Sequence, residues 1–106
     1  MNGRGKVERR KHVRHPLSMT IQFYHGQSRR EYPARTVNVS DGGMLMYVPV
    51  SAPVAPGHTI RINLGSLPRP EFSGLGGGPR DATIVRVERG EIAEAGYLPV
   101  GVHFIE

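Results

Sequence analysis

Hydrophobic and polar residues alternate in short runs along most of the chain after residue 16. The first run extends from Leu17 to Phe23, with apolar side chains at every second position. Successive side chains of a β-strand point to opposite faces, so a period of two is typical of a strand with one buried face. The pattern therefore predicts a first strand that begins at Leu17.

Five further segments show the same pattern, and turn-forming or proline- and glycine-rich stretches separate them. No segment of a dozen residues shows the apolar stripe of a helix. Six short strands favour an all-β fold, a six-stranded antiparallel β-barrel without a substantial C-terminal helix, because closure removes exposed strand edges. The later predicted strands cover Tyr32 to Val39, Met44 to Val48, Thr59 to Leu64, Asp81 to Glu88 and Val100 to Phe104.

Two local signals refine this scheme. Asp41-Gly42 separates the second and third predicted strands, which favours a tight hairpin with a primed turn and positive φ at its central residues. Pro33 has no backbone N–H to donate, so it favours a strand edge or a strand start. The methionines Met19, Met44 and Met46 fall in strand segments and are expected in the core.

Length and composition limit the remaining possibilities. The chain has 106 residues, enough for one domain with one modest core. It has no cysteine, which excludes disulfides, thiolate metal sites and a cysteine nucleophile. No stretch approaches the roughly 20 apolar residues that span a bilayer, and no signal peptide is recognisable. We therefore expect a soluble cytoplasmic protein without a membrane partner.

The net charge of +5 is concentrated at the N-terminus. Residues 1–15 contain six basic side chains and one acidic side chain, whereas residues 16–106 contain eight of each. This asymmetry divides the chain into a flexible basic arm, residues 1–15, and a barrel domain, residues 16–106. A concentrated basic arm indicates an anionic partner.

Two groups of residues resemble the paired motifs of the PilZ domain family. Arg10 and Arg14 are separated by three residues just before the first predicted strand, as in the family's arginine motif. Asn38, Ser40 and Gly43 match its second motif, Asp or Asn, any residue, Ser, two residues, Gly, at a turn between strands. The resemblance extends over roughly residues 8 to 105 and includes the last predicted strand. It implies a β-barrel that binds the second messenger cyclic di-GMP.

The side chains in these motifs suit that ligand. An arginine can donate two parallel hydrogen bonds to a phosphate or to guanine O6 and N7, and its flat face can stack on a base. The Asn38 amide and the Ser40 hydroxyl can bond a guanine edge or a phosphate. At Gly42 and Gly43 the backbone could approach the ligand closely, and Gly43 could adopt a positive φ.

Arg9 could add a third guanidinium. In the family, an arginine at that position tends to accompany two mutually intercalated ligand molecules, although a solvated charge is an equally good interpretation. Because fixing the arm backbone costs more than a single contact returns, we also expect an arm that becomes ordered over the nucleotide and relays ligand binding to a protein effector. Many members of the family have a C-terminal helix that covers one opening of the barrel. Without it, we expect that opening to be covered by the loop 65–79 or by a partner, so the protein would be a monomer or a homodimer.

Other functions have weaker support in the sequence. The five histidines show no metal-ligand spacing, so no metal and no cofactor is expected. No acid, base and nucleophile can be grouped, which argues against an enzyme. One alternative is a degenerate PilZ adaptor that binds proteins but no nucleotide. Another is a basic barrel that binds nucleic acid, which is disfavoured because residues 16–106 are neutral and lack an aromatic stacking platform.

Overall fold

The computed structural model describes residues 14–63, 79–90 and 96–105, and all regular secondary structure in these ranges is β-strand. None of the described residues lies in a helix that is long and apolar enough to cross a membrane. The strands are β1 (His15–Pro16), β2 (Thr20–His25), β3 (Arg30–Val39), β4 (Gly43–Pro49), β5 (Thr59–Asn63), β6 (Pro79–Val87) and β7 (Tyr97–Phe104).

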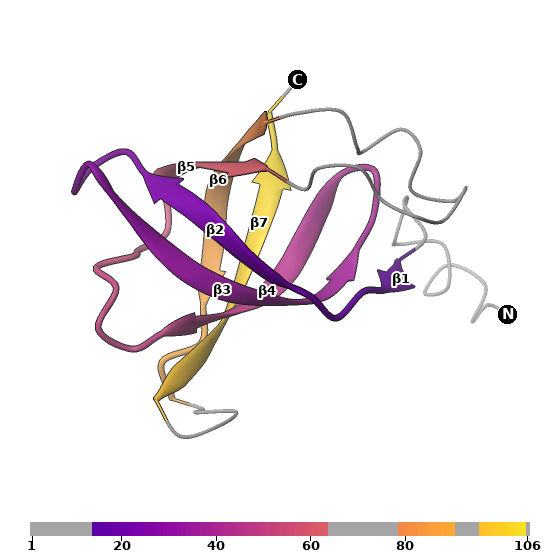
Figure 1. Ribbon diagram of the computed structural model, residues 1–106, viewed down its shortest axis with the longest axis horizontal. Helices are drawn as coiled ribbons and strands as arrows, with labels where there is room; N and C mark the ends of the chain where they lie inside the picture. Colours follow the sequence, from indigo (N-terminus) through magenta and orange to yellow (C-terminus); the bar gives the residue numbers. More distant parts are fainter. Residues whose placement is uncertain (1–13, 64–78, 91–95, 106) are drawn as a thin grey trace, which may run out of the picture.

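Six of these strands form a closed antiparallel barrel, as predicted (Figure 1). The order around the barrel is β3, β2, β5, β6, β7 and β4, and the pairing of β4 with β3 closes it. The short strand β1 lies outside this ring and pairs with the end of β3, beyond the last residue that β2 reaches. Closure leaves no continuous open edge, which is the advantage that favours a barrel for strands this short.

The core consists of the inward-facing residues of all six barrel strands. Phe23 of β2 and Ile84 of β6 are almost fully buried, as are Met44 and Met46 of β4, whereas Met19 is partly buried against the cluster. The connection between β4 and β5 adds Ala52 and Val54. Burial of these apolar side chains is the main stabilising contribution, about 1.5 to 3 kcal/mol for each large one.

The predicted start of the first strand at Leu17 is wrong, because the chain is irregular between β1 and β2. The buried hydroxyl of Thr36 donates to the carbonyl of Leu17 and accepts a hydrogen bond from the amide of Met19. This side chain occupies the place of regular ladder bonds, so β2 begins only at Thr20. Pro33, in contrast, lies where β3 pairs with β2 alone, since pairing with β4 begins at Arg35, and the predicted edge position is confirmed.

Two β-bulges interrupt the alternation of the barrel strands. In β3 the register with β4 shifts between Thr36 and Asn38, and in β6 the register with β7 shifts between Ile84 and Arg86. A bulge inserts one residue into a strand and so reverses the face to which the following side chains point. Thr36 and Ile84 are therefore buried, whereas Asn38 and Arg86 reach the outer surface.

Candidate functional site

Strand β1 brings the end of the basic arm next to the polar hairpin. It pairs His15 with Val39 and Pro16 with Asn38, so Arg14 enters beside the last residues of β3. Arg14 Nη1 donates a hydrogen bond of 2.8 Å to Asn38 Oδ1. One residue from each of the two predicted motifs is thus in direct contact.

The hairpin between β3 and β4 is held by Ser40. The Ser40 amide donates to the Gly43 carbonyl at 2.8 Å, and the Ser40 hydroxyl accepts hydrogen bonds from the amides of Gly42 and Gly43, both at 3.2 Å. Ser40 is 3% exposed, whereas Asp41 at the tip is exposed. In this conformation the Ser40 hydroxyl satisfies the turn rather than pointing into solvent.

The predicted role of positive φ in this hairpin is wrong. Among the described residues, φ is positive only at Arg29, Gly57 and Gly96. Gly43 is required for a different reason, because a Cβ there would lie 2.3 Å from the carbonyl oxygen of Val102 in β7. The glycine therefore permits close packing of β4 against β7, and the close approach is to a strand of the barrel.

A groove of about 250 Å³ lies on the outer surface beside the Arg14–Asn38 contact. Arg14 and Asn38 line it together with residues of β4, β6 and β7, which include Leu45, Arg86 and Gly101. The cross-strand pairs place Asn38 opposite Leu45, Leu45 opposite Gly101, and Gly101 opposite Arg86. One row across four strands thus joins Asn38 to Arg86.

The structure does not bring all predicted site residues into this groove. Arg9 and Arg10 lie outside the described residues. Ser40, Gly42 and Gly43 form the turn next to the groove, and only Arg14 and Asn38 line it. Arg86 was not predicted as a site residue, although the sequence contains a signal for it. Arg86 comes two residues after the core residue Ile84, so in a regular strand its side chain would point into the core, where an unpaired charge is costly. A bulge in β6 is therefore needed to turn it outward.

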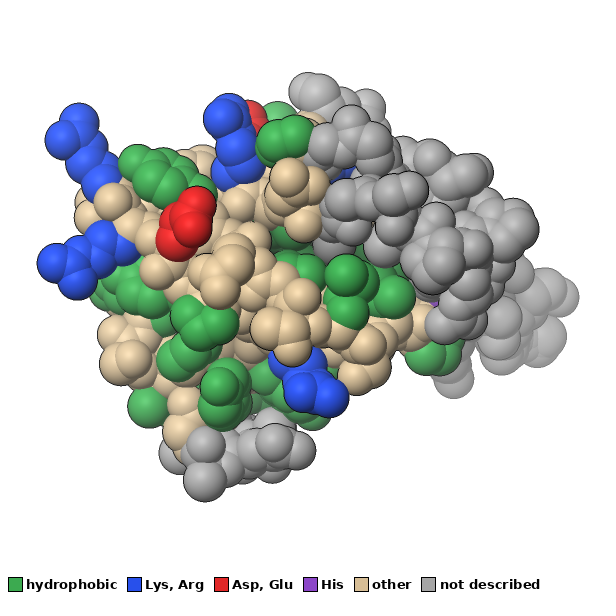
Figure 2. Space-filling view, viewed as in Figure 1, with side chains coloured by type: hydrophobic (Ala, Val, Ile, Leu, Met, Phe, Trp, Pro, Cys, Tyr) green, Lys and Arg blue, Asp and Glu red, His purple; other side chains and the backbone are tan. Residues whose placement is uncertain are grey.

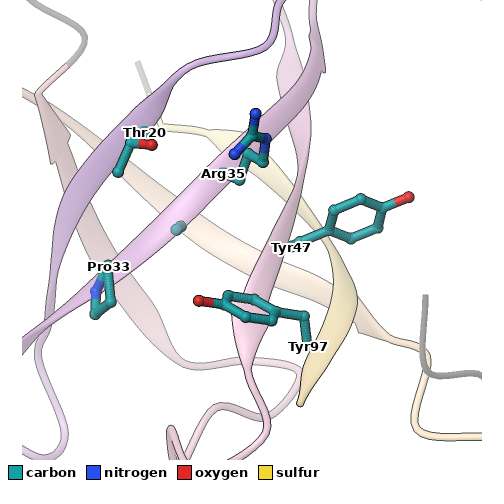
Figure 3. Close-up of a pocket in the computed structure, with 6 residues that line it drawn as sticks. Thr20, Pro33, Arg35, Tyr47 and Tyr97 are labelled. Atoms are coloured by element: carbon teal, nitrogen blue, oxygen red, sulfur yellow. The ribbon is translucent and has the colours of Figure 1, made fainter. Parts of the chain in front are cut away.

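A second pocket, of about 180 Å³, lies on another part of the barrel surface between β3 and the start of β7. Its lining includes Arg35, Tyr47 and Tyr97 (Figure 3). The Tyr97 ring extends toward β3, whereas the Tyr47 hydroxyl points the other way. None of the predicted site residues lines this pocket.

A buried histidine lies at the β2–β3 turn. Ser28 N–H donates to His25 Nδ1 at 3.2 Å, so Nδ1 is unprotonated and the proton of the neutral ring is on Nε2, which donates to His58 Nδ1 at 2.9 Å. Burial lowers the pKa of His25, and the electrostatic interaction with the neighbouring His58 lowers it further. The Ser28 hydroxyl, 2.7 Å from Nδ1 and 3.1 Å from the Tyr32 hydroxyl, completes the network. Within the described ranges, no group of three His, Cys, Asp or Glu side chains could hold a metal ion.

Fold and site together define a small β-barrel domain with a polar groove at the junction of an N-terminal arginine and a Ser-Gly hairpin. The family model of the PilZ domain matches residues 8–106. The chain therefore belongs to the PilZ domain family, as its motifs predicted. No curated protein sequence matches the chain.

Two solved structures show the same fold. The Bacillus subtilis inhibitor of motility, MotI/DgrA, is 19% identical with a TM-score of 0.67 over 92% of this chain, which spans 43% of that protein. The PilZ domain of YcgR from Escherichia coli, solved with c-di-GMP, is 21% identical with a TM-score of 0.61, covering 92% of this chain and 79% of that one.

Proposed function

We propose that this protein is a cytoplasmic receptor for cyclic di-GMP that relays binding of the nucleotide to a protein effector. The observation that carries the proposal is the 2.8 Å contact between Arg14 and Asn38 at the rim of the outer groove. It joins one member of each family motif, and both side chains can bond a nucleotide. The PilZ domain of YcgR, which shares the fold, was solved with this ligand.

The proposed mechanism is an order switch of the arm. Fixing the backbone of five residues, 10–14, costs roughly 5 to 10 kcal/mol. One charged hydrogen bond returns only about 1.5 to 3 kcal/mol, so a ligand must engage both arginines and the groove at once to hold the arm. Hydrogen exchange of the arm amides is then expected to slow when ligand is added, and equal exchange with and without ligand would refute the switch.

Titration calorimetry with cyclic di-GMP, cyclic di-AMP, GTP and an oligonucleotide tests the function. We expect binding of cyclic di-GMP alone, and a loss of about 2 kcal/mol or more, roughly 30-fold in Kd, for Arg10→Ala and for Arg14→Ala. Arg61→Ala is the control, because Arg61 lies on β5 and pairs with Asp81 away from the groove. The isotherm also gives the stoichiometry, which is two ligands per chain if Arg9 supports an intercalated pair.

The adaptor that binds proteins without nucleotide is the second candidate. The pocket of Arg35, Tyr47 and Tyr97 favours it, since arginine and tyrosine are enriched at protein interfaces. Nucleic acid is a poorer candidate, because among the described residues the basic side chains on the face in Figure 2 stand apart from one another. A protein that binds none of the four compounds would favour the adaptor, and one that binds only the oligonucleotide would favour nucleic acid.

A further inference from the structure

The feature that the proposed function leaves unused is Arg86, at the far end of the cross-strand row from Asn38. Two bulges, one in β3 and one in β6, turn Asn38 and Arg86 outward at the two ends of this row. Without the bulge in β6, Arg86 would share the inward face of Ile84. Bulges are enriched beside functional sites, where they redirect a side chain.

The surroundings of Arg86 hold its guanidinium over the groove. Gly101, its partner across the strands, has no side chain, and Arg86 Nε and Nη2 lie 4.0 Å and 3.9 Å from the position that a Cβ of Gly101 would occupy. Arg86 Nε forms an ion pair with a Glu88 carboxylate oxygen at 2.7 Å. The Nε edge of the guanidinium is therefore engaged by an exposed ion pair.

This arrangement leaves one edge of the guanidinium for a ligand. With Nε engaged by Glu88, the terminal nitrogens Nη1 and Nη2 form no other hydrogen bond or ion pair with the described residues. Two parallel N–H donors in one plane match the O6 and N7 acceptors of guanine. Adenine presents an amino donor in place of O6, so the same edge would reject it.

We propose that Arg86 reads the O6–N7 edge of one guanine of the bound nucleotide and thereby sets its selectivity for guanine over adenine. This inference rests on the proposed function, because it assigns specificity within the same groove. Arg14 and Asn38 hold the ligand at one end of the row, and Arg86 identifies its base at the other end. Glu88 acts as a positioning residue that orients Arg86.

Calorimetry of Arg86→Ala and Arg86→Lys with cyclic di-GMP and cyclic di-AMP tests the proposal. For Arg86→Ala we expect a loss of about 10- to 100-fold in affinity for cyclic di-GMP and a smaller ratio between the two ligands. Arg86→Lys keeps the charge but not the planar fork, so it should lose the same selectivity. Gly101→Val, whose Cβ would already lie 3.9 Å from Arg86 Nη2 and whose methyl groups would crowd the guanidinium, should also reduce selectivity.

The control is Arg61→Ala, which removes an ion pair of closely similar geometry on another face. Arg61 Nε lies 2.8 Å from Asp81, and its side chain is 61% exposed, compared with 62% for Arg86. Full selectivity in Arg86→Lys, or a loss in Arg61→Ala equal to that in Arg86→Ala, would overturn the proposal. If the wild-type protein bound no cyclic di-GMP, the receptor function would be overturned as well. If the wild type bound cyclic di-GMP and Arg86→Ala kept the same affinity and selectivity, this inference alone would be overturned.

Discussion

Replacing Gly43 by alanine should destabilise the barrel, although the residue belongs to the motif through which the family is recognised. The added Cβ would stand 2.3 Å from the Val102 carbonyl oxygen, whereas ordinary contact begins at 3.4 Å. The obstacle is backbone, so β4 and β7 must separate by about 1 Å. Overpacking of this kind costs about 2 to 3 kcal/mol.

Gly101→Ala is the matched control for this prediction. Gly101 also lies in the β4–β7 ladder, but its Cβ would meet nothing closer than 3.9 Å. Because alanine restricts the unfolded chain more than glycine does, Gly101→Ala should be neutral or more stable by about 0.5 to 1 kcal/mol. The two variants should therefore differ by about 3 kcal/mol.

Urea unfolding of the two variants and the wild type measures this difference. Each kcal/mol corresponds to roughly 4 to 8 °C in Tm for a domain of this size, so thermal unfolding should show Gly43→Ala lower by about 10 to 20 °C. An unchanged m-value would show that the substitution alters the stability of the native state and not the surface area that unfolding exposes. If Gly43→Ala unfolded within about 0.5 kcal/mol of the wild type, the argument from close packing would be wrong.

Three further predictions concern the turns of the barrel. The pKa of His25 is lowered in the folded state from the ordinary histidine value of 6.5, so the unfolded chain binds more protons as the pH falls through that value. The free energy of unfolding should therefore fall as the pH drops from about 7.5 to 5.5. Thermal unfolding of His25→Gln should show a smaller fall over the same pH range. Ser40→Ala removes the acceptor for two turn amides and should cost about 1 to 2 kcal/mol in urea unfolding, with no loss if the hydroxyl serves only a ligand. Arg29 has φ of 58°, a left-handed conformation that is unfavourable for any residue except glycine, so Arg29→Gly should raise the free energy of unfolding by about 0.5 to 1 kcal/mol. A decrease would show that contacts of the Arg29 side chain stabilise the protein by more than its backbone conformation destabilises it.

The six barrel strands could be predicted because each buries one face, and burial of one face imposes a period of two. The errors fall where that period fails. Between Leu17 and Thr20 a buried threonine hydroxyl replaces ladder bonds, and nothing in the local sequence indicates that Thr36, far along the chain, provides it. Two-residue β1 is too short to produce any pattern, and it exists only because β3 extends beyond β2.

The candidate site could be predicted in part for similar reasons. Arg14 and Asn38 were identified from motif spacing, which does not depend on knowing the register. The outward position of Arg86 depends on a bulge. The only signal for it in the sequence is a charged residue at a position where the alternation set by Ala82 and Ile84 would place an inward-facing side chain. Gly43 was expected to adopt a positive φ, whereas the structure shows a close approach to Val102 instead, in a strand that the sequence cannot align with β4.

The motif residues consequently divide into two sets that a binding assay alone would not separate. Ser40 and Gly43 are buried and hold the hairpin and its packing on β7, so their substitution would weaken the proposed ligand binding through the fold. Arg14 lies at the groove surface and ends in a side-chain contact to Asn38. A loss of affinity therefore indicates a ligand contact only when the free energy of unfolding is unchanged, a condition that Gly43→Ala should not meet.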